Sequence, residues 1–157
     1  MDFLIRDAEL ADASSFARLF GFVEEFHRER LPARFRRPNG GYAEDFLKET
    51  LARDDSRIFV AESGGAVVGY VFLMIKEMPS HPLIHPGKLV SVEQLSVDPK
   101  ARRMGVGSKL MSGAEKFAKE NGFLELELNV WKFNPDAEEF YGRLGYAATR
   151  TSFSKKL

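Results

Sequence analysis

The chain has 157 residues, the length of one domain, and its 23 Lys and Arg residues balance 23 Asp and Glu residues. This balance gives no indication of nucleic-acid binding through overall charge. The absence of cysteine excludes disulfides, thiol catalysis and cysteine-ligated metals. No apolar run approaches the ~20 residues that span a bilayer, and the N-terminus lacks the features of a signal peptide. We therefore expect a single cytoplasmic domain over residues 1–157, with no membrane partner.

Hydrophobic periodicity and turn residues divide the chain into strands and helices. The first half predicts a strand at 3–5, helices at 10–26 and 42–51, and a hairpin of strands at 58–61 and 66–75. After a proline-rich loop, the second half predicts a strand at 88–97, a helix at 104–121, a strand at 123–130, a helix at 134–145 and a closing strand at 146–153. The order β-α-α-β-β-β-α-β-α-β predicts a mixed α/β sheet, and the strand–helix–strand unit from 88 to 130 requires a parallel pair.

The strand at 88–97 changes phase along its length. At strict period two, Val90 and Val92 point to one face, whereas Leu95 and Val97 point to the other. An extra residue near Glu93, a β-bulge, would return both pairs to one face; the alternative is a strand buried on both faces. The strand at 123–130 alternates regularly, and we expect its leucines to point inward and its glutamates outward.

The helix predicted at 104–121 starts in a segment that suits an anion. The segment reads Arg102-Arg103-Met104-Gly105-Val106-Gly107-Ser108 and follows an Asp-Pro turn at the end of the strand. Unpaired N–H groups at a helix start attract negative charge, and glycines let a diphosphate reach the backbone. The spacing differs from the phosphate-loop and dinucleotide-binding patterns. An ordinary tight turn is the alternative explanation.

The segment resembles the Gln/Arg-x-x-Gly-x-Gly/Ala signature of the GNAT acyltransferase superfamily. A second segment, Asn134-Pro135-Asp136-Ala137-Glu138-Glu139-Phe140-Tyr141-Gly142-Arg143-Leu144-Gly145-Tyr146, is similar to the family's Asn-x-x-Ala-x-x-Phe-Tyr-x-x-x-Gly-Phe segment, with Tyr146 in place of the usual Phe. Together with the strand order, the two segments extend the resemblance over essentially the whole chain. The resemblance implies the GNAT fold and an N-acetyltransferase that moves an acetyl group from acetyl-CoA to a primary amine of a small molecule or peptide.

The resemblance also assigns residues to the site. Those expected along coenzyme A are Leu95, Ser96, Val97, Arg102, Arg103, Met104, Gly105, Val106, Gly107, Ser108, Asn134 and Tyr141. Tyr141 would also give a proton to the departing thiolate, and Glu93, with its pKa raised by burial, would take one from the amine through a water. The alternatives are a core tyrosine and a surface carboxylate paired to an arginine. The residues expected on the acceptor side are His27, Phe35, Tyr42 and Asn129.

Other functions are open at this point. His81 and His85 have a metal-like spacing, but flanking prolines deny them a helix face and no third ligand is near in sequence, so we expect no metal. A non-catalytic coenzyme A-binding sensor or scaffold is one alternative, and a nucleotide-binding protein is another. The presence of Tyr141 favours the enzyme, and the lack of a phosphate-loop lysine disfavours the nucleotide. A homodimer is left open, because the closing strand could pair at a sheet edge.

Overall fold

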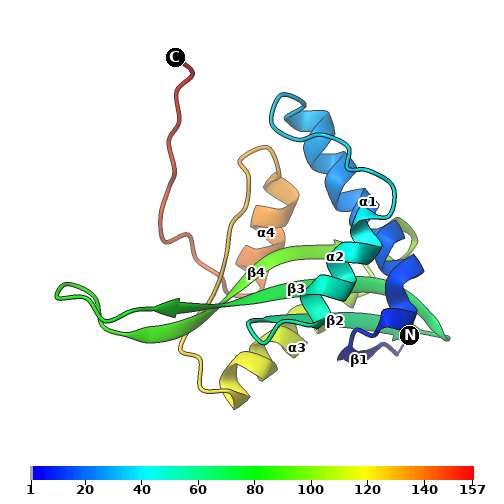
Figure 1. The fold of residues 1–157 in the computed structure, drawn as a ribbon, viewed down its shortest axis with the longest axis horizontal. Coiled ribbons are helices and arrows are strands. Elements are labelled where there is room, and N and C mark those ends of the chain that lie inside the picture. The colour runs from blue at the N-terminus through cyan, green and yellow to red at the C-terminus, as the bar shows by residue number, and fades with distance from the viewer. Residues whose placement is uncertain (1) are drawn as a thin grey trace.

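A computed structural model describes residues 2–157 as a central sheet with helices on both faces (Figure 1). The sheet has the order β1-β2-β3-β4-β5, with strands β1 (Leu4–Asp7), β2 (Ser56–Ser63), β3 (Ala66–Met78), β4 (Gly87–Val97) and β5 (Leu126–Leu128). The helices are α1 (Ala13–Arg30), α2 (Tyr42–Leu51), α3 (Val106–Glu120) and α4 (Pro135–Arg143), with short 3-10 helices at Leu10–Asp12 and Pro99–Ala101. Within residues 2–157, no helix combines the length and apolarity needed to cross a membrane.

The sheet pairing confirms the predicted mixed topology. The first four strands pair antiparallel in chain order, and β4 pairs parallel with β5 through the crossover helix α3. Two apolar cores lie on the two faces of the sheet. One packs against α3 around Leu110 and Met111, and the other packs under α1 and α2 around Phe16 and Leu47, all fully buried. Each such side chain contributes about 1.5–3 kcal/mol by leaving water, so both faces of the sheet are held firmly.

The predicted bulge in the fourth strand is present. Phe72 of β3 pairs with Gln94 and the next residue, Leu73, pairs with Val92, so Glu93 is the extra residue on β4. The apolar residues of β4 before and after the bulge pack against the same core on the α3 side. The bulge therefore resolves the change of phase and turns Glu93 out of the regular ladder.

The fifth strand is much shorter than predicted. Only Leu126–Leu128 forms a strand within the expected 123–130, and Leu124, which was expected to point inward, is 91% exposed. The strand ends at Leu128 because β4 supplies a partner only as far as Val92, where its bulge begins, whereas Leu124 lies at the opposite end, before the first pair of the ladder, Val90 with Leu126. Beyond Val92 no ladder holds the chain on the β5 side, although alternation of side chains continues in the sequence.

The closing strand predicted at 146–153 is not formed. Tyr146 is held near α4 by a hydrogen bond from its N–H to the Tyr141 carbonyl (3.0 Å), but residues 147–157 have no strand partner within the described chain. These residues, called the tail from here on, run as an extended segment away from the sheet (Figure 1). The sequence pattern of a strand is present in the tail, but in the described chain the tail pairs with no strand.

Candidate active site

The parting of β4 from β5 opens the sheet at the bulge. Residues Val90, Ser91 and Val92 pair with β5, whereas the described residues of β4 beyond Glu93 pair with β3 alone. Alternate backbone groups of residues 94–97 are therefore unpaired toward β5. An extended ligand with amide groups can bond to such groups as an added strand would. The Ser96 hydroxyl is engaged elsewhere, since it donates to the Leu19 carbonyl (2.8 Å), so Ser96 can serve such a ligand only through its backbone.

The loop before α3 has the backbone of an anion site. Arg103 and Gly105 both take left-handed conformations, with φ of 61° and 85°. Such turns gather successive N–H groups into a concave nest, and the first N–H groups of α3 lie directly behind it. Arg102 and Arg103 are exposed there and add positive charge. A Cβ added to Gly105 would meet no atom within 4 Å, so glycine is favoured here by its positive φ and not by close packing. The space beside it is open to a ligand. These features fit a diphosphate.

Gly107 has a packing role that the sequence did not indicate. A Cβ at Gly107 would lie 3.1 Å from the Phe140 ring, so the glycine lets α4 approach the first turn of α3 closely. Helix α4 begins as predicted, with Asn134 as its cap: the Asn134 side-chain oxygen accepts from the Ala137 N–H (3.2 Å), and Pro135 occupies the first turn. The two sequence signatures are therefore in contact, and α4 is fixed relative to the anion-binding loop.

Tyr141 projects from α4 into partly apolar surroundings. Its ring centroid lies 5.0 Å from that of Phe140 and 5.9 Å from that of Tyr146. Burial raises the pKa of Tyr141 to about 12, because the phenolate would lose its hydration. The neighbouring Tyr146 hydroxyl donates to Glu115 (2.9 Å). Among side-chain hydrogen bonds of residues 2–157, none involves the Tyr141 hydroxyl, which is therefore available to a ligand.

The expected burial of Glu93 is wrong. The Glu93 side chain is exposed, and its Oε1 lies 3.3 Å from the Nζ of Lys76 on β3. Lys76 also donates to the Ser91 hydroxyl (3.1 Å) and lies 3.9 Å from Glu127 of β5. The bulge turns Glu93 outward over the opening of the sheet, where no helix covers it. The surface ion pair considered as the alternative is found, with lysine in place of arginine.

A second carboxylate, Glu24 on α1, was missed by the sequence analysis. It is half-buried, burial raises its pKa, and it forms no ion pair within residues 2–157. Its negative charge adds to burial in raising the pKa of Tyr70, whose hydroxyl donates to Gln94 beside the bulge (2.8 Å). The available signal was position: Glu24 follows Phe16 and Phe20 at four-residue spacing, on the apolar stripe of the helix.

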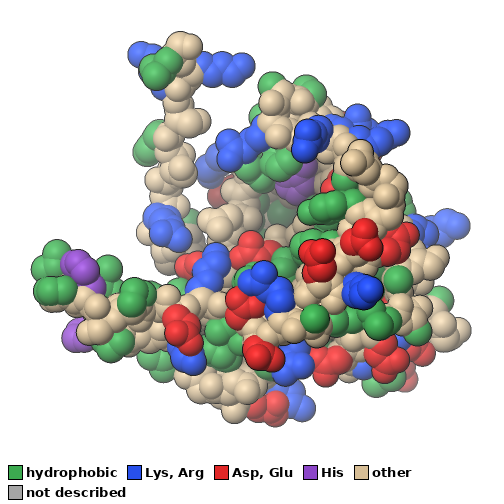
Figure 2. Space-filling view, viewed as in Figure 1, with side chains coloured by type: hydrophobic (Ala, Val, Ile, Leu, Met, Phe, Trp, Pro, Cys, Tyr) green, Lys and Arg blue, Asp and Glu red, His purple; other side chains and the backbone are tan. Residues whose placement is uncertain are grey.

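Five rings form a continuous group above this region, which we call the aromatic wall: Phe26, His27, Phe35, Trp131 and Phe133. His27 and Phe35 were predicted on the acceptor side, with ring centroids 5.4 Å apart, and the other three were not. The wall joins the end of α1 to the segment after β5. Figure 2 shows a hollow in this face that contains a histidine and apolar side chains, with acidic side chains below.

The His27 ring is oriented by its own helix. Its Nδ1 lies 2.7 Å from the Val23 carbonyl, so the Nδ1–H donates and Nε2 is the nitrogen left for other partners. The wall also carries cations at its rim, because the Arg30 guanidinium lies 3.6 Å from the centroid of Phe26. The Arg34 guanidinium likewise lies 5.2 Å from the Trp131 ring centroid, so the π faces of the wall attract cations.

The other two residues expected on the acceptor side do not join the wall. Tyr42 packs against Phe20 and Phe46 over α2, with ring centroids 6.0 and 6.2 Å away. Asn129 lies exposed just after β5. The loop with His81 and His85 is the tip of the β3–β4 hairpin, which extends far from the hollow (Figures 1 and 2).

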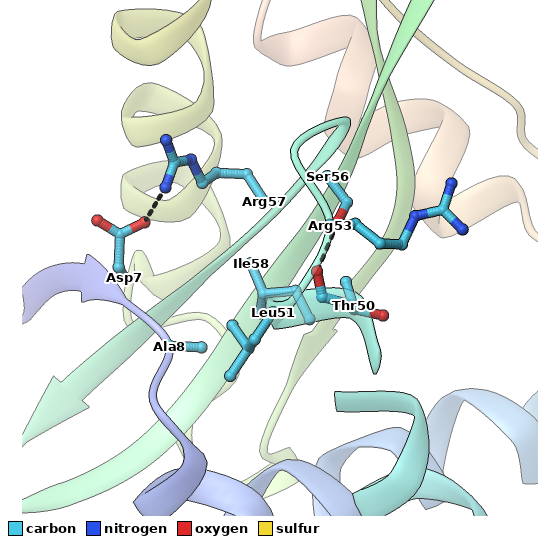
Figure 3. Close-up of a pocket in the computed structure, with 8 residues that line it drawn as sticks. All are labelled: Asp7, Ala8, Thr50, Leu51, Arg53, Ser56, Arg57 and Ile58. Atoms are coloured by element: carbon cyan, nitrogen blue, oxygen red, sulfur yellow. Dashed lines mark hydrogen bonds and ion pairs between the residues drawn. The ribbon is translucent and has the colours of Figure 1, made fainter. Parts of the chain in front are cut away.

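A cavity of about 230 Å³ lies at a separate place, between β1, β2 and the end of α2 (Figure 3). Its polar groups are already paired: Arg57 lies 3.6 Å from Asp7, and the Ser56 hydroxyl donates to the Thr50 carbonyl (2.8 Å). None of the residues expected in the site lines it. The cavity is therefore not part of the candidate site.

Comparisons with known proteins identify the fold and the family of this chain. The sequence profile described as "Acetyltransferase (GNAT) family" matches residues 20–146. The chain is 32% identical over 142 residues to the uncharacterised N-acetyltransferase YhfO of Bacillus subtilis, covering 90% of this chain and 88% of the relative. The fold matches a tetramutant of the BH1408 protein from Bacillus halodurans with TM-score 0.92 at 24% identity, covering 98% and 99% of the two chains. It also matches the aminoglycoside N-acetyltransferase AAC(6')-Iy in complex with CoA, with TM-score 0.79 at 18% identity, covering 99% and 95%. The chain therefore belongs to the GNAT acetyltransferase family.

Proposed function

We propose that this acetyltransferase moves an acetyl group directly from acetyl-CoA to a primary amine of a small molecule or peptide in the cytoplasm. One observation carries the proposal: β4 loses β5 as a partner at the Glu93 bulge and continues, with unpaired backbone, to the anion-binding loop at Gly105. A ligand with a diphosphate at one end and an amide-containing arm matches this arrangement. Coenzyme A has both parts.

The donor-binding residues follow from this match. The nest at Arg103 and Gly105, with the start of α3, would hold the pyrophosphate, and residues 95–97 would bond to the arm. The bound thioester supplies the acetyl group. Within the protein, the close contact of Gly107 with Phe140 fixes α4, and so sets the position of Tyr141 relative to the anion site.

Two residue types would handle protons. A lysine-like amine has a pKa of about 10.4, so it must lose a proton before it can attack. Glu93 would take that proton through a water, and it must first exchange its contact with Lys76. Tyr141, whose pKa is raised to about 12, keeps its hydroxyl hydrogen at neutral pH and would present it to the departing sulfur.

Glu24 is a second candidate for the base. Its pKa is raised by burial, which is the property expected of a general base, whereas Glu93 is exposed. Both carboxylates lie near Gln94. Glu24 acts on Tyr70, whose hydroxyl donates to Gln94, and Glu93 precedes Gln94 on β4. Together with the aromatic wall, they favour an acceptor that enters as a cation.

The test is an acceptor panel with acetyl-CoA, in which release of free thiol is measured with small-molecule and peptide amines. Acetyl-CoA alone should raise the melting temperature. At 100 times its dissociation constant, a ligand increases the free energy of unfolding by about 2.7 kcal/mol. Thiol release that depends on an amine would support the proposal. A thermal shift without thiol release for any amine would identify a coenzyme A-binding module instead. An equal thermal shift with ATP would favour a nucleotide site.

A further inference from the structure

The end of α1 and the loop that follows it are rich in arginine. Residues 28–37 include Arg28, Arg30, Arg34, Arg36 and Arg37, and the only acidic residue among them is Glu29. Figure 2 shows Lys and Arg side chains gathered along the upper rim of the hollow that contains the histidine. The chain as a whole has no net charge, so this positive charge is a local property of the side on which the acceptor is expected.

Arg34 differs from its neighbours because it has no acidic partner. Arg28 and Arg37 both contact the Glu25 carboxylate. Arg34 is exposed, and its side chain forms no ion pair and donates no hydrogen bond within residues 2–157. Its guanidinium lies over Trp131, with 5.2 Å from its central carbon to the ring centroid. A guanidinium above a ring keeps its N–H donors free at the edge, so Arg34 can bind an anion.

The position of Arg34 connects it with the acceptor and not with coenzyme A. It follows α1, which covers the same face of the sheet as α2. The nest at Gly105 opens at the start of α3, which covers the opposite face. The pyrophosphate therefore has an anion site of its own on the other side of the sheet. The guanidinium beside the aromatic wall needs a different anion.

The other end of the aromatic wall has the opposite charge. Glu24 forms no ion pair within residues 2–157, and it lies about 4.5 Å along the helix axis from His27, which is part of the wall. From His27 to Phe35 and from Phe35 to Trp131, the ring centroids are 5.4 and 6.1 Å apart. These rings separate the Glu24 carboxylate from the Arg34 guanidinium. An α-amino acid holds its two charges on one carbon and is too short to reach both ends.

Building on the proposed function, we infer that the acceptor carries an anionic group at the end opposite its amine, and that Arg34 binds this group. The flat guanidinium matches the paired oxygens of a carboxylate or phosphate. The amine end then points toward Glu24 and the bulge. A short peptide with a free C-terminus and an amino acid with a terminal amine both have this form. A polyamine does not, because its second ammonium would meet the arginines.

The experiment compares acceptors that differ by one charge. Gly-Phe is paired with its C-terminal amide, and ε-aminocaproate with its amide, so each pair keeps its amine and its apolar body. Thiol release from acetyl-CoA should give a kcat/KM about 10-fold higher for each acid. This value lies between the effect of an exposed ion pair and that of a hydrogen bond to a charged group. The difference should lie in KM, because Arg34 holds the same anion before and during transfer.

Arg34→Gln should bring the ratio between each acid and its amide to about one, by raising KM for the acid alone. The exposure of Arg34 means that this change leaves the core intact. Arg37→Gln is the matched control. It removes the same charge from the same loop, but its guanidinium lies 3.8 Å from the Glu25 carboxylate, so the preference for acids should persist. Equal loss of the preference in both variants would overturn the role of Arg34.

If none of the four compounds releases thiol, calorimetric binding to the protein with coenzyme A decides. Tighter binding of the acids, removed by Arg34→Gln, would support the inference although acetyl transfer fails. The inference is overturned if the amides react or bind as well as the acids, if the preference survives Arg34→Gln, or if no compound reacts or binds. Thiol release without a preference for the acids would leave the proposed function intact, so the two failures are distinct.

Discussion

Substitution of Tyr141 by Phe removes one hydroxyl and tests the proposed acid. The pKa of Tyr141 is raised to about 12, whereas a thiol has a pKa of about 8.5. Full proton transfer from the phenol to a thiolate is therefore uphill by about 3.5 pKa units, or ~5 kcal/mol. The hydroxyl can still stabilise the departing thiolate as a hydrogen-bond donor. A hydrogen bond to a charged group contributes about 1.5–3 kcal/mol.

We therefore expect Tyr141→Phe to lower kcat by roughly 10–150-fold, which lies mostly below the 10²–10⁴-fold range for general acids. The KM for acetyl-CoA should change little, because the bond forms as the sulfur departs. Initial rates of thiol release give both constants. Tyr146→Phe is the matched control: it removes a hydroxyl from the adjacent ring, but that hydroxyl serves Glu115, so kcat should be retained.

The pH dependence sharpens this test. An acid is active while protonated, so its contribution is lost only as the pH rises through its pKa. With a pKa of about 12, the ratio of wild-type to Tyr141→Phe rates should stay constant from about pH 7 to pH 10. A ratio that falls toward one between pH 8 and 10 would indicate an ordinary tyrosine and contradict the effect of burial. Full activity of Tyr141→Phe at every pH would refute the role altogether.

Two further pairs of variants test the base and the anion site. In pH–rate profiles, Glu93→Gln should reduce the rate most at low pH and less as the pH rises, because a neutral amine needs no base. If Glu24→Gln shows this profile instead, and Glu93→Gln has the wild-type profile, the base is Glu24. In thermal-shift measurements, Gly105→Glu should abolish the response to acetyl-CoA by placing bulk and negative charge in the nest. Gly122→Glu is the matched control. Gly122 lies just after α3 at a φ of 73°, so a glutamate there has the same conformational cost as at Gly105, about 1–2 kcal/mol, and the response to acetyl-CoA should be kept. Loss of the response in both variants would mean that destabilisation, not the anion site, explains the first.

The parts of the fold that sequence predicts best are those set by local periodicity. The two longest helices and the strands β3 and β4 match their apolar patterns, and the change of phase at Glu93 correctly indicates a bulge. The short β5 and the unpaired tail were not predicted, because strand formation needs a partner as well as a pattern. Val130 continues the alternation in sequence, yet β4 has already turned away at Glu93, before Val130 could pair.

The site shows the same division. The anion-binding loop could be predicted, since glycine spacing and helix position are local properties. The environment of Glu93 could not, because the approach of Lys76 depends on the register between two strands. The aromatic wall combines Phe35 with Trp131, which are far apart in sequence, and only the tertiary structure brings them together. Glu24 was recognisable in principle from its place on an apolar helix stripe.

The bulge divides β4 into two parts with different tolerance to mutation. Residues 89–92 are buried, with sheet partners on both sides from Val90 to Val92, so substitutions there change stability. From Glu93 onward one side of the strand is unpaired, and Glu93 itself is exposed, so its replacement leaves the core intact. A library that seeks new acceptors should therefore vary Glu93 with Glu24 and leave the first half of the strand unchanged. Deletion of Glu93 should be avoided in such work: Leu95 and Val97 would keep the core face at strict period two, but the bulge at which β4 parts from β5 would be lost.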